Sequence, residues 1–252
     1  MTSAVDGGAW IRRYRPAPEA AVRLLCLPHA GGSAGAYLPM ARALAPRADV
    51  LAAQYPGRQD RYAEPPSTNL RELAERVVEA VEALGGDDDR PLALFGHSMG
   101  AVVAHEAALR LEAAGRAPLR LFVSGRRAPS VIREPGNLHR AGDAELLAAV
   151  RDLNGTDSEV FEDEELVQLV LPALRGDYTA LETYEPRPGA RLGCPVTVLT
   201  GDADPVTPVA DARAWADHTD GPTEVCVFPG GHFFLNDRPG EVADVVRRHL
   251  GL

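Results

Sequence analysis

A serine between two glycines, in Gly96-His-Ser-Met-Gly100, is the best-placed nucleophile in this chain. The apolar run Leu92–Phe95 leads directly into Gly96, and Ala101–Leu111 follows with helical composition and neither Gly nor Pro. A strand, a tight turn and a helix with G-x-S-x-G at the joint form a nucleophile elbow. Glycines permit the strained turn, which exposes the hydroxyl above a helix N-terminus. The pattern therefore predicts that Ser98 is the nucleophile.

A second stretch, Gly31-Gly-Ser-Ala-Gly35, has the same spacing, so the motif alone leaves Ser33 open. A short loop separates this motif from the apolar run before it, which favours the later serine. The elbow fold also needs an earlier glycine-rich loop that donates a backbone N–H to the developing oxyanion. We therefore assign Pro28-His-Ala-Gly-Gly32 to this role. The expected oxyanion-hole donors are the N–H groups of Ala30 and of Met99, which follows the nucleophile.

A serine hydroxyl needs a general base, and the base needs an acid that orients it. In an α/β-hydrolase the chain order is nucleophile, acid, histidine. His232 follows the last predicted strand and fits the order as the base. Asp202 and Asp204 both follow the strand before it, and both remain open as the acid. The carboxyl ends of parallel strands are where such sheets place their sites.

The alternation of predicted strands and helices over residues 1–252 predicts one domain with a mostly parallel sheet flanked by helices. Together with the elbow motif and the order of the candidate residues, this indicates an α/β-hydrolase fold. Ser67 or Thr68 is expected to cap the second helix. The predicted strands are Trp10–Tyr14, Val22–Leu27, Val50–Gln54, Leu92–Phe95, Leu119–Val123, Pro195–Thr200 and Glu224–Phe228, and the predicted helices are Tyr37–Leu44, Leu70–Leu84, Ala101–Leu111, Val209–Ala216 and Val242–Leu250.

Residues 126–188 interrupt this alternation and predict a helical lid inserted in the domain. The segment is acidic at 159–165 and contains the helical patterns Ala144–Leu153, Glu164–Leu174 and Tyr178–Tyr184. Ordinary crossover helices are the alternative, but some sixty residues exceed what one crossover needs.

Composition excludes several classes of partner. The net charge is −10 and no long basic run occurs, so nucleic acid is not expected. No apolar run approaches the roughly 20 residues that span a bilayer. Cys26, Cys194 and Cys226 suggest small buried side chains rather than disulfides, so we expect a cytoplasmic protein. The motifs H-E-x-x-H, C-x-x-C and G-x-G-x-x-G are absent from the sequence, so we expect no metal and no cofactor.

The chain resembles the type II thioesterases that accompany polyketide synthases and nonribosomal peptide synthetases. The resemblance implies the catalytic triad Ser98, Asp204 and His232, and it selects Asp204 over Asp202. Its collinear motifs span nearly the whole chain: Pro28-His-Ala-Gly-Gly-Ser33, Gln54-Tyr-Pro-Gly-Arg58, Gly96-His-Ser-Met-Gly100, Ser124-Gly-Arg-Arg-Ala-Pro129, Leu174-Arg-Gly-Asp-Tyr178, Gly201-Asp-Ala-Asp-Pro205 and Gly231-His-Phe-Phe234.

By this resemblance, the partner is an acyl or peptidyl carrier protein, and the substrate is an acyl thioester on its phosphopantetheine arm. Such enzymes remove aberrant acyl groups that stall the assembly line. Because the chain begins at Met1 without a carrier domain, a free-standing enzyme is expected. Arg58, Arg61, Arg126 and Arg127 are candidates for docking an acidic carrier, with plain surface or turn anchors as the alternative.

Three other functions remain open at this stage. A small-ester esterase or lipase would use the same residues, and a terminal cyclising thioesterase would release larger products. An inactive carrier-binding module is the alternative from a different class, although an intact set of catalytic residues argues against it.

Overall fold

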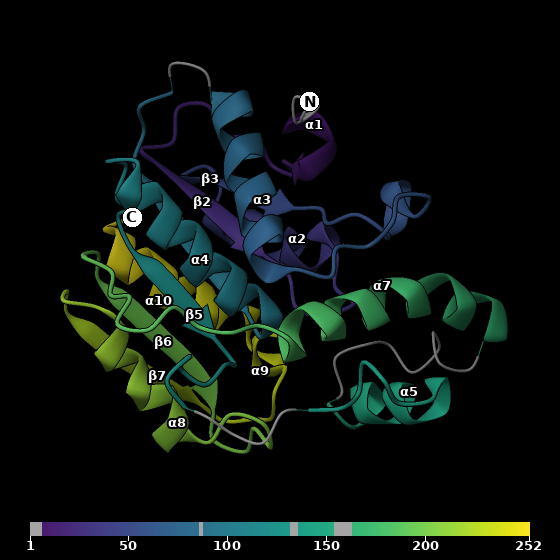
Figure 1. Ribbon diagram of the computed structural model, residues 1–252. Helices are drawn as coiled ribbons and strands as arrows, with labels where there is room; N and C mark the ends of the chain where they lie inside the picture. Colours follow the sequence, from purple (N-terminus) through teal and green to yellow (C-terminus); the bar gives the residue numbers. More distant parts are fainter. Residues whose placement is uncertain (1–6, 86–87, 132–135, 154–162) are drawn as a thin grey trace.

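The computed structural model describes residues 7–85, 88–131, 136–153 and 163–252 (Figure 1). Within them, a seven-stranded sheet has the order β1-β3-β2-β4-β5-β6-β7. β1 pairs with β3 antiparallel, and the other neighbours pair in parallel, as predicted. The strands are β1 (Ile11–Arg12), β2 (Val22–Leu27), β3 (Ala48–Ala53), β4 (Leu92–His97), β5 (Leu121–Ser124), β6 (Val196–Gly201) and β7 (Thr223–Phe228).

Helices cover both faces of the sheet. Leu25 and Leu27 of β2 join a buried cluster with α3 and α4, whereas Leu24 and Cys26 join a cluster with α2 and α10. Side chains alternate between the faces of a strand, so a strand covered on both sides must be apolar on both. The helices outside the segment between β5 and β6 are α1 (Gly7–Trp10), η1 (Ala34–Tyr37), α2 (Leu38–Leu44), η2 (Gln59–Arg61), α3 (Leu70–Gly85), α4 (Met99–Ala113), α8 (Val209–Arg213), η3 (Ala214–His218), α9 (Phe234–Asp237) and α10 (Pro239–Leu250).

Helix α3 follows its predicted apolar spacing but has a different cap. Leu70, Leu73 and Val77 lie on one side of the helix and are buried in the core cluster that includes the sheet. The cap is Asn69, whose Oδ1 accepts the N–H of Arg71 at 2.9 Å and that of Glu72 at 3.2 Å. The prediction of Ser67 or Thr68 is therefore wrong, because the residue directly before the first turn reaches these free N–H groups.

Between β5 and β6 lie α5 (Asp143–Asp152) and α7 (Glu164–Glu182), which we call the helical lobe. The lobe projects from the sheet at the lower right of Figure 1. Its two helices share a small apolar cluster of their own, made by Leu146, Val150, Leu171 and Leu174. Within the predicted 126–188 insertion, residues 132–135 and 154–162 lie outside the described part, and so does most of the predicted acidic stretch.

The two predicted helices of residues 164–184 are one continuous helix, α7. The sequence patterns left residues 175–177 between the two predicted helices, and this gap contains Gly176, a residue that disfavours a helix interior. Gly176 instead lies where α7 closely approaches the body of the protein, since a Cβ there would lie 2.8 Å from Pro66 Cβ. The tertiary contact overrides the local propensity.

No described helix has the length and apolarity that crossing a membrane would require.

Candidate active site

The turn between β4 and α4 holds Ser98 in a conformation that residues other than glycine rarely adopt. Its φ is 54° and its ψ is −116°, and such strain concentrates at functional sites. The flanking residues must be glycines, because backbone atoms occupy the space that a side chain at either position would need. A Cβ on Gly96 would lie 2.1 Å from Gly100 O, and one on Gly100 would lie 2.0 Å from Leu27 O. The predicted elbow is therefore present.

Three side chains from the ends of β4, β6 and β7 meet at this turn. His232 Nε2 lies 3.0 Å from Ser98 Oγ, and His232 Nδ1 lies 2.8 Å from Asp204 Oδ2. His232 and Asp204 are buried, whereas Ser98 is partly exposed. A hydroxyl, an imidazole and a carboxylate thus form one hydrogen-bonded series, which is the geometry that activates a serine.

The two residues that the spacing left open, Ser33 and Asp202, lie outside this series. Asp204 is held from its other side, because its Oδ1 accepts the N–H groups of Val206 at 2.9 Å and Thr207 at 3.1 Å. Asp202 is exposed and accepts a backbone N–H of the loop that follows β7, so it shapes the turn. Ser33 has an ordinary extended backbone, and no described histidine is hydrogen-bonded to its side chain.

The predicted oxyanion donors have free N–H groups among the described residues. Met99 is the first residue of α4, so its N–H has no partner within the helix. In the glycine-rich loop, Gly31 N–H donates to Asp177 Oδ2 at 2.7 Å, and Gly32 N–H donates to a loop carbonyl at 2.9 Å. Ala30 N–H and Met99 N–H remain unpaired among the described residues, and α4 directs the positive end of its dipole towards this turn.

Two further imidazoles adjoin His232. The ring of His97 lies 5.1 Å from that of His232, and the ring of His29 lies 5.9 Å from that of His97, between centroids. Burial, then the charge of His232, lowers the pKa of His97 well below its ordinary value. Burial, followed by His232 and Arg58, lowers the pKa of His29 to about 4. His29 and His97 are therefore neutral near pH 7. Among the described residues, neither is hydrogen-bonded to a carboxylate as His232 is to Asp204.

A cavity of about 540 Å³ opens beside Ser98 and His232, within the usual size range of small-molecule sites. Arg126 also borders it, and burial lowers the pKa of this arginine to about 10. Most of the wall is apolar and comes from α4, the chain after β5 and the helical lobe. The apolar lining residues are Val102, Ala128, Pro129, Val131, Leu138, Ala149, Leu153, Leu181 and Val206.

The sequence model of the thioesterase domain matches residues 22–250, which include the elbow, Asp204 and His232. The chain belongs to the thioesterase domain family.

Individual thioesterases agree with this membership. Thioesterase PikA5 of Streptomyces venezuelae is 50% identical over 248 residues, covering 98% of this chain and 87% of that protein. The gramicidin S biosynthesis protein GrsT of Aneurinibacillus migulanus is 33% identical over 253 residues, covering 100% and 98%. The solved structure of BorB, a type II thioesterase from the borrelidin biosynthetic cluster, is 49% identical with a TM-score of 0.85, covering 96% of each chain. The α/β-hydrolase fold predicted from the sequence is confirmed.

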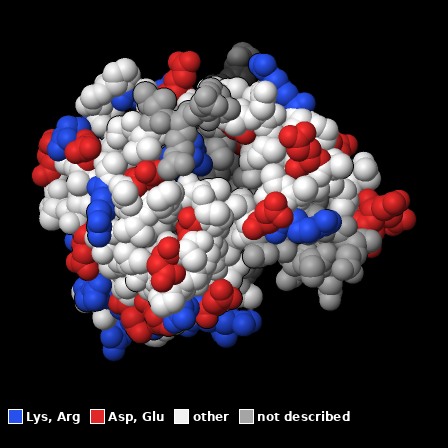
Figure 2. Space-filling model, turned by 90° about the horizontal axis from the view of Figure 1, so that it is seen from below, with Lys and Arg blue, Asp and Glu red and all other residues white. Residues whose placement is uncertain are grey.

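The four arginines predicted as carrier-docking candidates divide into two pairs in this thioesterase. Arg58 and Arg61 are only 7% and 6% exposed, so the docking prediction is wrong for them. They anchor turns, because their guanidinium groups bond to backbone carbonyls and carboxylates. Arg126 and Arg127 are partly buried and border the cavity. On the face shown in Figure 2, the described basic and acidic side chains are interspersed.

Two buried acidic residues near the site were not predicted from the sequence. Glu106, in α4, accepts a hydrogen bond from Tyr184 OH at 2.8 Å and lies 3.3 Å from an Arg187 nitrogen. It therefore ties the chain leaving the helical lobe to the elbow helix. The sequence did contain a signal for Glu106, because it is the one acidic residue within the mostly apolar stretch Ala101–Leu111. Asp177 lies in a matched motif for which the sequence suggested no role.

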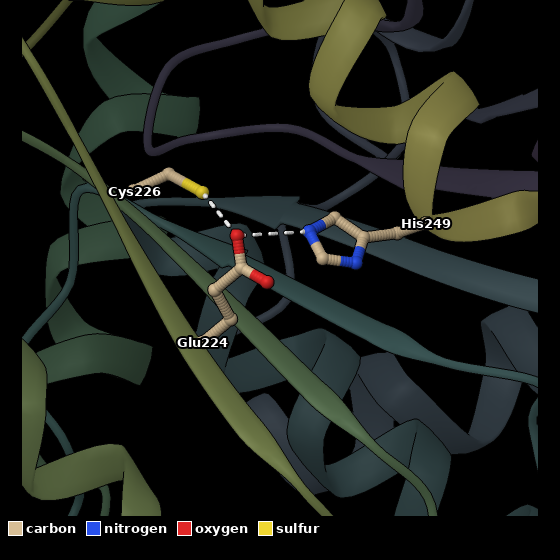
Figure 3. A group of neighbouring side chains, drawn as sticks. All are labelled: Glu224, Cys226 and His249. Carbon is tan, nitrogen blue, oxygen red and sulfur yellow. Dashed lines mark hydrogen bonds and ion pairs between the residues drawn. The ribbon is translucent and has the colours of Figure 1, made fainter.

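One group of possible metal ligands lies away from this site, where β7 meets α10 (Figure 3). Glu224 Oε1 lies 3.6 Å from Cys226 Sγ and 3.5 Å from His249 Nε2. Arg248 Nη2 also donates to two atoms of this group, to Glu224 Oε1 at 3.1 Å and to Cys226 Sγ at 3.8 Å. Its guanidinium already supplies the positive charge that a metal ion would bring, so we interpret the group as an ion-pair cluster.

Proposed function

We propose that this thioesterase hydrolyses acyl thioesters through a covalent acyl-enzyme, with Ser98 as nucleophile, His232 as general base and Asp204 as the acid that orients it. The observation that carries the proposal is the contact series Ser98–His232–Asp204 at a nucleophile elbow, in a member of the thioesterase family. No histidine in the described part of the chain is hydrogen-bonded to Ser33 in this way.

In the acylation step, His232 Nε2 takes the proton of Ser98 Oγ as this oxygen attacks the thioester carbon. Asp204 accepts a hydrogen bond from Nδ1–H and stabilises the imidazolium. The N–H groups of Ala30 and Met99 stabilise the oxyanion, a contribution that is usually worth about 10²–10³ in turnover per donor. Collapse of the intermediate breaks the C–S bond, and the thiol leaves with the proton from His232.

In the deacylation step, water attacks the acyl-serine ester while His232 accepts its proton. The second tetrahedral intermediate uses the same two N–H donors. His232 then returns the proton to Ser98 Oγ, and the carboxylic acid is released. Every proton transfer uses side chains of this chain, and the phosphopantetheine belongs to the substrate.

We further propose that the substrate is carried by an acyl or peptidyl carrier protein, and that the enzyme removes aberrant acyl groups during polyketide or nonribosomal peptide synthesis. Support comes from the relatives, which include a type II thioesterase of a borrelidin cluster and a protein of gramicidin S biosynthesis. The helical lobe would be the lid of the site, since Tyr178, Leu181 and Ala149 border the cavity. The apolar wall suits an acyl chain.

The decisive experiment compares hydrolysis of short acyl groups from a phosphopantetheinylated carrier protein by the wild type, Ser98→Ala and Ser33→Ala, with matched p-nitrophenyl esters alongside. We expect thioester release that only Ser98→Ala abolishes. Loss in Ser33→Ala alone would exchange the roles of the two motifs. Ester turnover with an intact carrier thioester would make the protein an esterase, and inertness to a serine-directed fluorophosphonate would favour an inactive binding module.

A further inference from the structure

A buried ion pair between the helical lobe and Arg58 lies against the glycine-rich loop of residues 28–34, which we call the oxyanion loop. Asp177 on α7 is 2% exposed and Arg58 is 7% exposed. The Arg58 guanidinium donates to both carboxylate oxygens, with Nη1 at 2.6 Å from Oδ2 and Nη2 at 2.8 Å from Oδ1. This is a bidentate, charge-assisted contact, the strongest kind that these side chains make.

The same two side chains also hold the backbone of the oxyanion loop. Asp177 Oδ2 accepts the Gly31 N–H at 2.7 Å, and Arg58 Nη1 donates to Gly32 O at 3.1 Å. Gln54 supports the far end of the loop, because its Oε1 accepts the Ala34 N–H at 3.0 Å while its Nε2 donates to Arg58 O at 3.2 Å. Side chains from two distant segments thus fix the peptide groups that follow Ala30.

We propose that Asp177 is a positioning residue for catalysis: by binding the Gly31 N–H while paired with Arg58, it sets the orientation of Ala30 N–H in the oxyanion hole. Asp177 touches no reacting atom and acts through the loop. The inference rests on the proposed function, since it assigns a support to one of its oxyanion donors.

Two physical considerations favour a positioning role over a purely stabilising one. A buried ion pair is a poor source of stability, because desolvating both charges offsets most of their attraction. Burial opposes the charge of Arg58, but the adjacent Asp177 carboxylate holds the pKa of the guanidinium above its ordinary value, so the arginine keeps its charge. A fixed charge beside a catalytic loop restrains its backbone, and donors must be pre-oriented to stabilise an oxyanion.

The test uses Asp177→Asn and a double variant, Arg58→Met with Asp177→Leu, in the full chain. The double variant replaces the ion pair with apolar side chains and is expected to fold, as such replacements usually do. It offers no acceptor to Gly31 N–H. For both variants we expect kcat to fall by about 10- to 100-fold with KM changed less than threefold, since the lost interaction acts on the transition state.

Asp143→Asn provides the matched control. Asp143 also belongs to the helical lobe and also pairs with an arginine of α7, at 2.6 Å from Arg175 Nη2. Its side chain is exposed, and among the described residues it makes no hydrogen bond to the oxyanion loop. We expect kcat and KM of this variant to match the wild type.

Unchanged kcat in a folded double variant would overturn the proposal, as would an equal loss in Asp143→Asn. A loss confined to KM would assign Asp177 to substrate binding and would also overturn it. Far-ultraviolet circular dichroism and the unfolding temperature of each variant establish that it is folded at the assay temperature. If the wild type hydrolyses only p-nitrophenyl esters, the substrate proposal fails, but the effect of Asp177 on kcat is still measured because ester hydrolysis uses the same oxyanion hole.

Discussion

Asp202 and Asp204 are two residues apart and differ in what their carboxylates contact. Asp204 is buried against His232 Nδ1 and two backbone N–H groups, whereas Asp202 is exposed on a turn. A buried carboxylate on Nδ1 fixes the imidazole tautomer that leaves Nε2 free to accept a proton. Substituting each aspartate in turn therefore tests the effect of these contacts, because the two residues have the same side chain and nearly the same position in the sequence.

We predict that Asp204→Asn lowers kcat by about 10³- to 10⁴-fold, because an amide no longer holds the productive tautomer. Asp202→Asn keeps an acceptor for its turn and is expected to retain kcat within about twofold. Initial rates of thioester hydrolysis, at saturating substrate and neutral pH, measure both. A larger loss in Asp202→Asn would exchange the roles of the two acids.

The hydrogen-bonded series Ser98–His232–Asp204 was predictable because local pattern and chain order bring these three residues together. Ser98 sits in a motif whose glycines have a steric requirement, and His232 follows from the order of elements. The partners of Asp177 were not predictable in the same way. Arg58 and Gly31 are 119 and 146 positions away in the sequence, and no periodicity or turn motif records which loop packs on which helix.

At the scale of elements, the ends of strands and helices were both predicted to within a few residues, but the continuity of α7 was not predicted. Runs such as Val22–Leu27 are buried on both faces, so their composition alone identifies them. Helix α7 was predicted as two helical patterns with Gly176 in the gap between them, whereas it is one helix. The contact with Pro66 that makes glycine necessary there belongs to tertiary structure, which the sequence pattern does not contain.

Gly176→Ala separates helix propensity from packing. Propensity alone predicts stabilisation by about 1 kcal/mol in a helix interior. We expect destabilisation by about 1–3 kcal/mol instead, because the added Cβ would lie 2.8 Å from Pro66 Cβ and the helix or the loop must shift. Urea unfolding at neutral pH measures the difference.

Gly240→Ala is the control for this prediction. Gly240 lies in α10, and a Cβ there would have no neighbour within 4 Å. We expect this variant to be unchanged or stabilised by up to about 1 kcal/mol. If Gly176→Ala were equally stabilising, α7 would not be in tight contact with the loop at Pro66.

At the scale of the whole molecule, buried neutral histidines make stability depend on pH. His105 in α4 is 2% exposed, and no described group bonds to its ring nitrogens. Burial, then the charges of His218 and Arg187, lowers its pKa to about 3. His29 and His97 are shifted in the same direction. In the unfolded chain, each of these imidazoles takes up a proton near its ordinary pKa of about 6.5.

We therefore predict that stability falls as pH decreases from about 6.5 towards 3. In this window the unfolded state binds more protons than the folded state, so acid favours unfolding, while above pH 7 these groups have no effect. His105→Leu should reduce the fall in unfolding temperature between pH 7 and pH 5. Thermal unfolding of both proteins at the two pH values tests this, and identical decreases would mean that His105 is not protonated on unfolding.

The unequal attachment of the two lobe helices has a consequence for how this family diverges. The C-terminal part of α7 is fixed, because Ala180 belongs to the main core and Asp177 accepts the Gly31 N–H of the glycine-rich loop. The buried residues of α5, Leu146 and Val150, belong only to the cluster shared with α7. Selection for a different acyl group can therefore remodel the α5 wall of the cavity and leave the chemistry intact, so substrate range and catalytic power can evolve separately.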